Sequence, residues 1–159
     1  MNIEDIKLLY AYNTWANKLI LSHAAKLTAE QLHQPTSFSW ENLHKTLVHT
    51  LDAEYGWRML CQHGSITFDM DPQNFPDIAA IQARWDEEEQ AMLEYLDSID
   101  DLDAIISYEV AEGIRNRVLW HCLIHVVNHG TQHRSECAAM LTDFGHSPGG
   151  IDLTLFLNQ

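Results

Sequence analysis

Histidine is unusually common in this 159-residue chain, with ten copies, and four of them recur at a fixed interval. His121, His125, His129 and His133 are each four residues from the next. Residues four apart lie on the same face of a helix, one turn from each other. Two neutral imidazoles in that arrangement can bind one divalent metal ion. A ladder of solvated histidines is the alternative interpretation of the same spacing.

The surrounding apolar pattern separates these four histidines. At about 100° per residue, His129 and His133 fall within the apolar stripe of the segment 119–144, whereas His125 falls at its edge and His121 further out. Buried imidazoles need partners, because burying an unpaired polar group is costly, and protonating both would place like charges side by side. A metal ion removes both difficulties. The pattern therefore favours His129 and His133 as a pair of ligands.

A third ligand is expected from the segment 40–63, where His49 shares a face with Ala53 and Gly56. These small residues let a facing helix approach closely. Three neutral imidazoles leave a coordination position open, which is typical of catalytic rather than structural metal sites. Cys137, one turn beyond His133, is the less favoured alternative that would close the site.

Other polar residues are candidates for the surroundings of the site. Glu136 lies on the stripe of the histidine pair and is expected to orient a ligand or take a proton, with an ordinary exposed glutamate as the alternative. Asn13 and Asn17 interrupt the apolar stripe of the first helix, so they either line the pocket or form hydrogen bonds within the core. His125, at the edge of its stripe, is a further pocket candidate.

Apolar periodicity predicts four long helices, at 3–27, 40–63, from Pro76 to about 99, and 119–144. Ser39 is the expected N-cap of the second helix, and Thr28 with Gln31 has capping-box spacing. The alternation within 105–118 indicates a small hairpin before the last helix. Gly145 suits the position that follows a helix end. Long helices with short connections predict an all-α fold, an antiparallel four-helix bundle in one domain spanning 1–159.

Composition excludes several classes of function. The chain has 23 acidic residues against nine Lys and Arg, a formal charge of −14, which argues against binding nucleic acid or an anionic membrane surface. No apolar run reaches the roughly 18 residues of a spanning helix, and acidic residues stand where a signal peptide would be basic. Three cysteines without paired spacing indicate buried apolar side chains in a reduced compartment. A cytoplasmic protein is expected.

The first helix has a second apolar face, formed by Leu8, Tyr12, Trp15 and Leu19. A helix that is apolar all round needs burial on both sides. Either this face forms a dimer interface, or the apolar C-terminal segment 151–157 covers it within one chain.

The residues of the site also carry a resemblance to a known family. The segment 125–134, HVVNHGTQHR, with DFGHSPGGIDL at 143–153, resembles the C-terminal signature of the DinB family of bacterial metalloproteins. LVHTLDAE at 47–54 is similar to the family's second-helix motif, and YNTWAN at 12–17 to its first helix. The resemblance covers nearly the whole chain.

This resemblance implies a four-helix bundle, usually a homodimer, in which His49, His129 and His133 hold a divalent ion, nickel or zinc. Characterised members include transferases and isomerases that use small thiols. The implied function is a metal-dependent thiol S-transferase acting on a small-molecule electrophile, with Arg134 or Glu136 in contact with substrate. A hydrolase using a metal-bound water, or a non-catalytic metal-binding stress protein, is the alternative.

Overall fold

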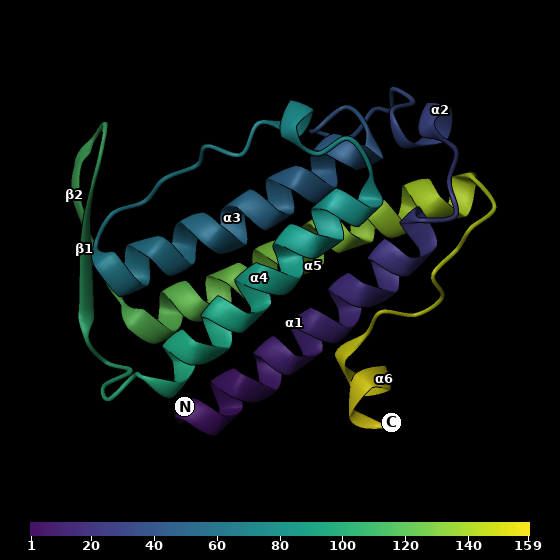
Figure 1. Cartoon of the computed structure of the whole chain (residues 1–159). Coiled ribbons are helices and arrows are strands. Elements are labelled where there is room, and N and C mark those ends of the chain that lie inside the picture. The colour runs from purple at the N-terminus through teal and green to yellow at the C-terminus, as the bar shows by residue number, and fades with distance from the viewer.

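Helices account for most of the computed structural model, which describes residues 1–159, and one two-stranded antiparallel sheet completes it (Figure 1). The predicted hairpin is confirmed, since Ile105 pairs with Val118 and Val110 with Gly113. None of the helices combines the length and apolar character that crossing a bilayer requires. The elements are α1 (Ile3–Ala24), α2 (Ala29–Leu32), α3 (Leu43–His63), the 3-10 turn η1 (Pro72–Asn74), α4 (Ile78–Asp97), β1 (Ile105–Val110), β2 (Gly113–Val118), α5 (Leu119–Asp143) and α6 (Leu153–Leu157).

Side-chain caps mark the start of every α-helix except α5. Thr28 and Gln31 form the predicted capping box at the start of α2. The predicted start of the second long helix is wrong, because Asn42 rather than Ser39 is the N-cap of α3 and accepts from the backbone N–H of Lys45. Glu41 has a left-handed backbone conformation, with φ of 67°, so the helix cannot extend toward the N-terminus through it.

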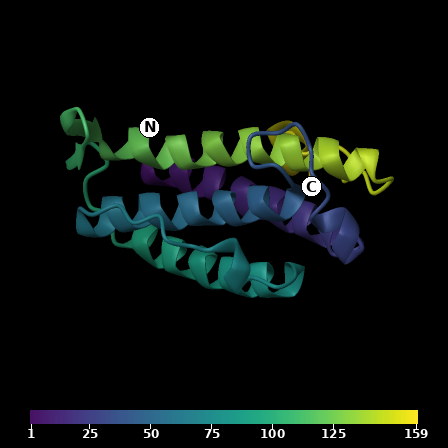
Figure 2. The same ribbon diagram turned by 90° about the horizontal axis from the view of Figure 1, so that it is seen from above.

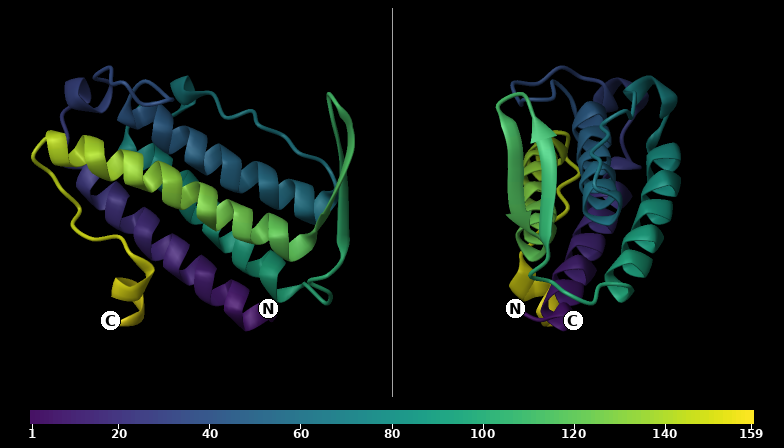
Figure 3. Two further views of the ribbon diagram at one scale, coloured as in Figure 1. Left: turned by 180° about the vertical axis from the view of Figure 1, so that it is seen from behind. Right: turned by 90° about the vertical axis from the view of Figure 1, so that its left-hand side faces the viewer.

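The long helices pack in a square, in which α1 and α3 each contact both α4 and α5. Contacts between residues of neighbouring helices show the relative directions of those helices. Glu54 meets Trp85 and Arg58 meets Glu88, so α3 and α4 run parallel. His49 lies beside His129, near the start of α3 and in the middle of α5. Figures 1 and 3 show α3 and α5 as antiparallel neighbours.

The connection from α3 to α4 explains the parallel pair. Residues 64–77 run back along the whole length of α3 before α4 begins (Figure 1). The expected antiparallel arrangement of consecutive long helices is therefore wrong for α3 and α4. Asp52 on α3 holds the returning chain by accepting from the backbone N–H groups of Asp69 and Met70.

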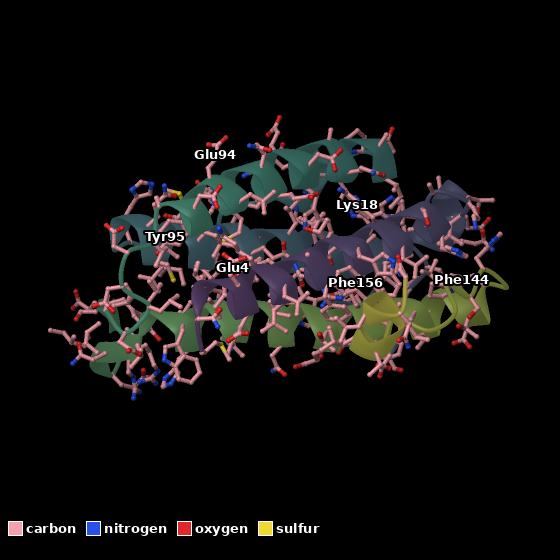
Figure 4. All side chains as sticks on the ribbon, turned by 90° about the horizontal axis from the view of Figure 1, so that it is seen from below. Glu4, Lys18, Glu94, Tyr95, Phe144 and Phe156 are labelled. Atoms are coloured by element: carbon pink, nitrogen blue, oxygen red, sulfur yellow. The ribbon has the colours of Figure 1, made fainter.

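The C-terminal segment returns to α1. Tyr12 donates a hydrogen bond to the carbonyl of Ile151 over 2.9 Å. The ring of Phe156, labelled in Figure 4, lies 6.1 Å from Tyr12 and 5.8 Å from Trp15 between centroids. The segment thus covers the Tyr12 and Trp15 part of the second apolar face of α1, while Leu8 stays 46% exposed.

Candidate metal centre

Three histidine side chains converge in the groove between α3 and α5. The Nε2 atom of His129 lies 3.2 Å from Nε2 of His49 and 3.1 Å from Nε2 of His133. One ligand atom from each residue falls within 4.8 Å of the other two. The helices α3 and α5, which are far apart in the sequence, thus bring together the three histidines that the sequence pattern predicted as ligands.

Hydrogen bonds alone do not satisfy this arrangement. The Nε2 atom of a neutral imidazole has either one proton or one lone pair. His129 can therefore make only one of its two short contacts as an N–H···N hydrogen bond. A metal ion about 2.0–2.1 Å from each nitrogen, in tetrahedral geometry, sets the nitrogens roughly 3.3 Å apart. The three imidazoles fit such an ion.

The surroundings keep two of these rings neutral. Burial, followed by the proximity of His133 and His129, lowers the pKa of His49 to about 4. Burial, followed by the charges of His133 and His125, lowers the pKa of His129 to about 4 as well. Both rings therefore carry a free lone pair at neutral pH, the form in which imidazole binds a metal.

Glu136 orients the third ring. Its Oε2 atom lies 2.7 Å from Nδ1 of His133, one turn away on α5. A carboxylate can only accept, so Nδ1 of His133 carries the proton and donates it. The Nε2 lone pair is then directed into the histidine group. This carboxylate–histidine pair is the usual support of a metal-binding imidazole.

An aromatic ring and a pocket adjoin His49. The indole of Trp40 stacks on the imidazole with centroids 3.8 Å apart and an interplanar angle of 19°. Trp40 lies on the connection between α2 and α3, which crosses over the C-terminal half of α5 (Figure 2). A pocket of about 420 Å³ opens beside the two rings and is lined also by Lys45, Asp52 and Met70.

Behind the histidines, a polar network crosses the core. Glu54 accepts from the side-chain amides of Asn13 and Asn17 and from the indole of Trp85. Arg134 donates to the amide oxygens of the same two asparagines. Asn13 and Asn17 thus take the core alternative. Arg134 is only 2% exposed, so of the two residues expected to contact substrate only Glu136 borders the histidine group.

The remaining histidine and cysteine candidates lie outside the group. The ring of His125 packs against Trp57, with centroids 4.7 Å apart, and lies 5.8 Å from the ring of His129. Cys137 is buried in the apolar core beside Met140 and does not join the three histidines. His125 is exposed and Cys137 faces inward because each lies away from the direction in which His129 and His133 point.

Sequence reasoning did not single out two residues that the structure places near the site. Trp40 is not detectable from the sequence, because the apolar pattern makes it the first residue of the second long helix. In the structure it lies in the loop before α3. Glu54 was detectable in principle, since it follows Leu47 and Leu51 on one apolar stripe of α3, where a carboxylate requires buried partners.

Comparison with known proteins identifies the family of the chain. The family model described as "DinB family" matches residues 1–159. A curated relative, Protein DinB of Bacillus subtilis (strain 168), is 26% identical over 168 residues, covering 94% of this chain and 91% of that protein. The family model matches the full length of the chain, and three histidines meet between two of its helices. The chain therefore belongs to the DinB family.

Proposed function

We propose that this chain is a divalent-metal protein whose ligands are His49, His129 and His133. The observation that carries the proposal is the convergence of three Nε2 atoms that hydrogen bonds cannot all satisfy. The tautomer held by Glu136 supports it, and so does the match to the family model. Imidazole ligands suit nickel and zinc. The four long helices are proposed to form the bundle typical of the family.

We further propose a metal-dependent enzyme of the thiol S-transferase type. Bound by neutral ligands, a divalent metal would hold a small thiol as its thiolate, the nucleophilic form. The pocket beside His49 is large enough for a small electrophile such as an epoxide, a halide or a conjugated carbonyl. Trp40 offers an aromatic surface to that molecule, and the ion pair of Lys45 with Glu41 lies at the rim. The protein is proposed to act as a cytoplasmic homodimer.

Metal analysis tests the first proposal. We expect untagged protein to carry one divalent ion per chain, and His129→Ala and His133→Ala to lose it while they retain helical circular dichroism. His63→Ala is the matched control, because His63 is exposed at the end of α3. Stoichiometric metal in either ligand variant would contradict the assignment.

Turnover distinguishes the reaction types. A transferase consumes a small thiol together with an aryl halide or epoxide only when the metal is present. A hydrolase turns over an ester or amide without thiol, because its nucleophile is a metal-bound water. A non-catalytic metal-binding protein does neither when fully loaded, and that result would defeat the enzymatic proposal while leaving the metal site intact.

A further inference from the structure

Two thiols meet where the last turn of α3 packs against the first turn of α5. Cys61 and Cys122 are both free and both belong to one buried apolar cluster. Their thiols are close enough to share a side-chain hydrogen bond. Tyr95 of α4, labelled in Figure 4, lies in the same cluster. The sequence showed no paired spacing, because the two cysteines are brought together only by helix packing.

The register of the helix pair places these thiols at the same level independently. The rings of Trp57 on α3 and His125 on the antiparallel α5 are in contact, with centroids 4.7 Å apart. From that contact toward the hairpin end, Cys61 lies about 6 Å further along α3 and Cys122 about 4.5 Å further along α5. Cys61 lies about 18 Å along α3 from His49. The thiol pair therefore lies several helical turns from the histidines and is separate from the proposed metal site.

We propose that Cys61 and Cys122 form a redox-active dithiol, which a low-molecular-weight disulfide oxidises to an intramolecular disulfide that links α3 to α5. Two protein thiols and one small disulfide give one protein disulfide and two small thiols. The protein sulfurs are oxidised, the small disulfide is reduced, and the two protons leave on the released thiols. The histidines take no part, so the inference does not rest on the proposed metal chemistry.

The two cysteines have different roles in this exchange. Cys61 is 9% exposed and adjoins the exposed residues 62–64, whereas Cys122 is 2% exposed. Cys61 is thus the sulfur that meets the small disulfide, forming a mixed disulfide as the first thiol leaves. Cys122 then attacks Sγ of Cys61, and the second thiol leaves.

The electrostatic environment favours a thiolate on Cys122, the sulfur that attacks in the second step. The hydrogen bond from Cys61, together with the nearby charge of Arg117, lowers the pKa of the Cys122 thiol. The same hydrogen bond, together with burial, raises the pKa of Cys61. The charge of Arg117 remains when Cys61 has become a mixed disulfide, so it favours the Cys122 thiolate that then attacks Sγ of Cys61. The thiolate is the form that attacks a disulfide.

Thiol counting after oxidation tests the proposal. The folded protein is treated with oxidised glutathione, denatured, alkylated with N-ethylmaleimide and weighed by mass spectrometry. We expect wild type to lose two hydrogens and to take one alkyl group, on Cys137. Cys137→Ser, the matched control from the other apolar cluster, should lose two hydrogens and take none. Peptide mapping should find Cys61 joined to Cys122.

Single variants trap the intermediate. Cys122→Ser should retain one glutathione on Cys61, because no second thiol remains to displace it. Cys61→Ser should take no glutathione, because Cys122 is out of reach. Three alkyl groups on oxidised wild type, or a bridge that includes Cys137, would overturn the proposal. If the serine variants do not fold, wild type and Cys137→Ser decide the question alone.

Discussion

The chemistry of the histidine group depends on where its ring protons lie. Glu136 holds one proton on Nδ1 of His133, while burial favours the neutral forms of His49 and His129. Each effect acts on a single residue, yet together they present three lone pairs at one point. Changes at single atoms should therefore alter metal affinity without altering the fold.

Glu136→Gln tests the support of His133. Glutamine keeps the shape of the side chain but removes the charge that fixes the proton on Nδ1. We expect metal affinity to fall by about 10- to 100-fold, measured by titration against a competing chelator, with unchanged circular dichroism. Glu94→Gln, an exposed position on α4, should leave affinity unchanged. Equal affinities for wild type and Glu136→Gln would show that the contact has no such role.

The stability of the metal-free protein should depend on the same rings. His49 and His129 have pKa values of about 4 when folded and ordinary values near 6.5 when unfolded. The unfolded chain thus binds more protons between these values, so the free energy of unfolding is full above pH 6.5 and falls as pH drops toward 4. We expect this fall in urea titrations with chelator present.

Carboxylates also titrate toward pH 4, so the comparison needs a variant without one ring. The pH dependence of His129→Gln should be shallower than that of wild type over the same range. Parallel curves for the two proteins would mean that the buried rings do not carry the effect.

At the scale of elements, periodicity predicted which residues share one face of the same helix. It placed His129 and His133 on one face of α5, and capping-box spacing located the start of α2. It could not predict that Trp40 stacks on His49, because that contact depends on a loop. Nor could it predict that α3 and α4 run parallel, because direction depends on the path of residues 64–77 rather than on either helix.

Gly130 lets α1 and α5 approach each other closely, because it has no side chain. A Cβ atom at Gly130 would lie 2.6 Å from Nη1 of Arg134 and 3.0 Å from Oδ1 of Asn13. The guanidinium cannot move away cheaply, because Asn17 and Thr131 also hold it. Although alanine ordinarily stabilises a helix interior by about 1 kcal/mol over glycine, we expect the contact to reverse the sign here.

Gly130→Ala should therefore lower the free energy of unfolding by about 1–3 kcal/mol, measured by urea denaturation. Ser135→Ala, an exposed change on the same helix, should stay within about 0.5 kcal/mol of wild type. A stabilised Gly130→Ala protein would show that the helices can separate without cost.

For the whole molecule, the polar network divides the core. One apolar cluster contains Ile20 of α1 and Leu51 of α3, toward the α2 end. The other contains Ala16 of α1 and Cys61 of α3, toward the hairpin. Glu54, its asparagine partners, Trp85 and Arg134 join all four long helices between the two. The network therefore sets the register in which His49 meets the histidines of α5.

The charges of this network should be strongly coupled. Burial raises the pKa of Glu54 and lowers the pKa of Arg134, so each charge is costly without the other. Glu54→Leu and Arg134→Leu should each destabilise the protein by about 3–5 kcal/mol, because each leaves one buried charge unpaired. The double variant leaves none, so we expect its loss to be smaller than the sum by more than about 1 kcal/mol.

Urea denaturation of the four proteins measures this coupling directly. The exposed pair Lys18 and Glu89, which also joins α1 to α4, is the matched comparison. Alanine at either of these positions should cost at most about 1 kcal/mol, since water screens exposed ion pairs. Strictly additive losses at Glu54 and Arg134 would contradict the network. If Glu54 and Arg134 are coupled and Lys18 and Glu89 are not, the interaction that aligns the helices lies in the core, directly behind the histidines.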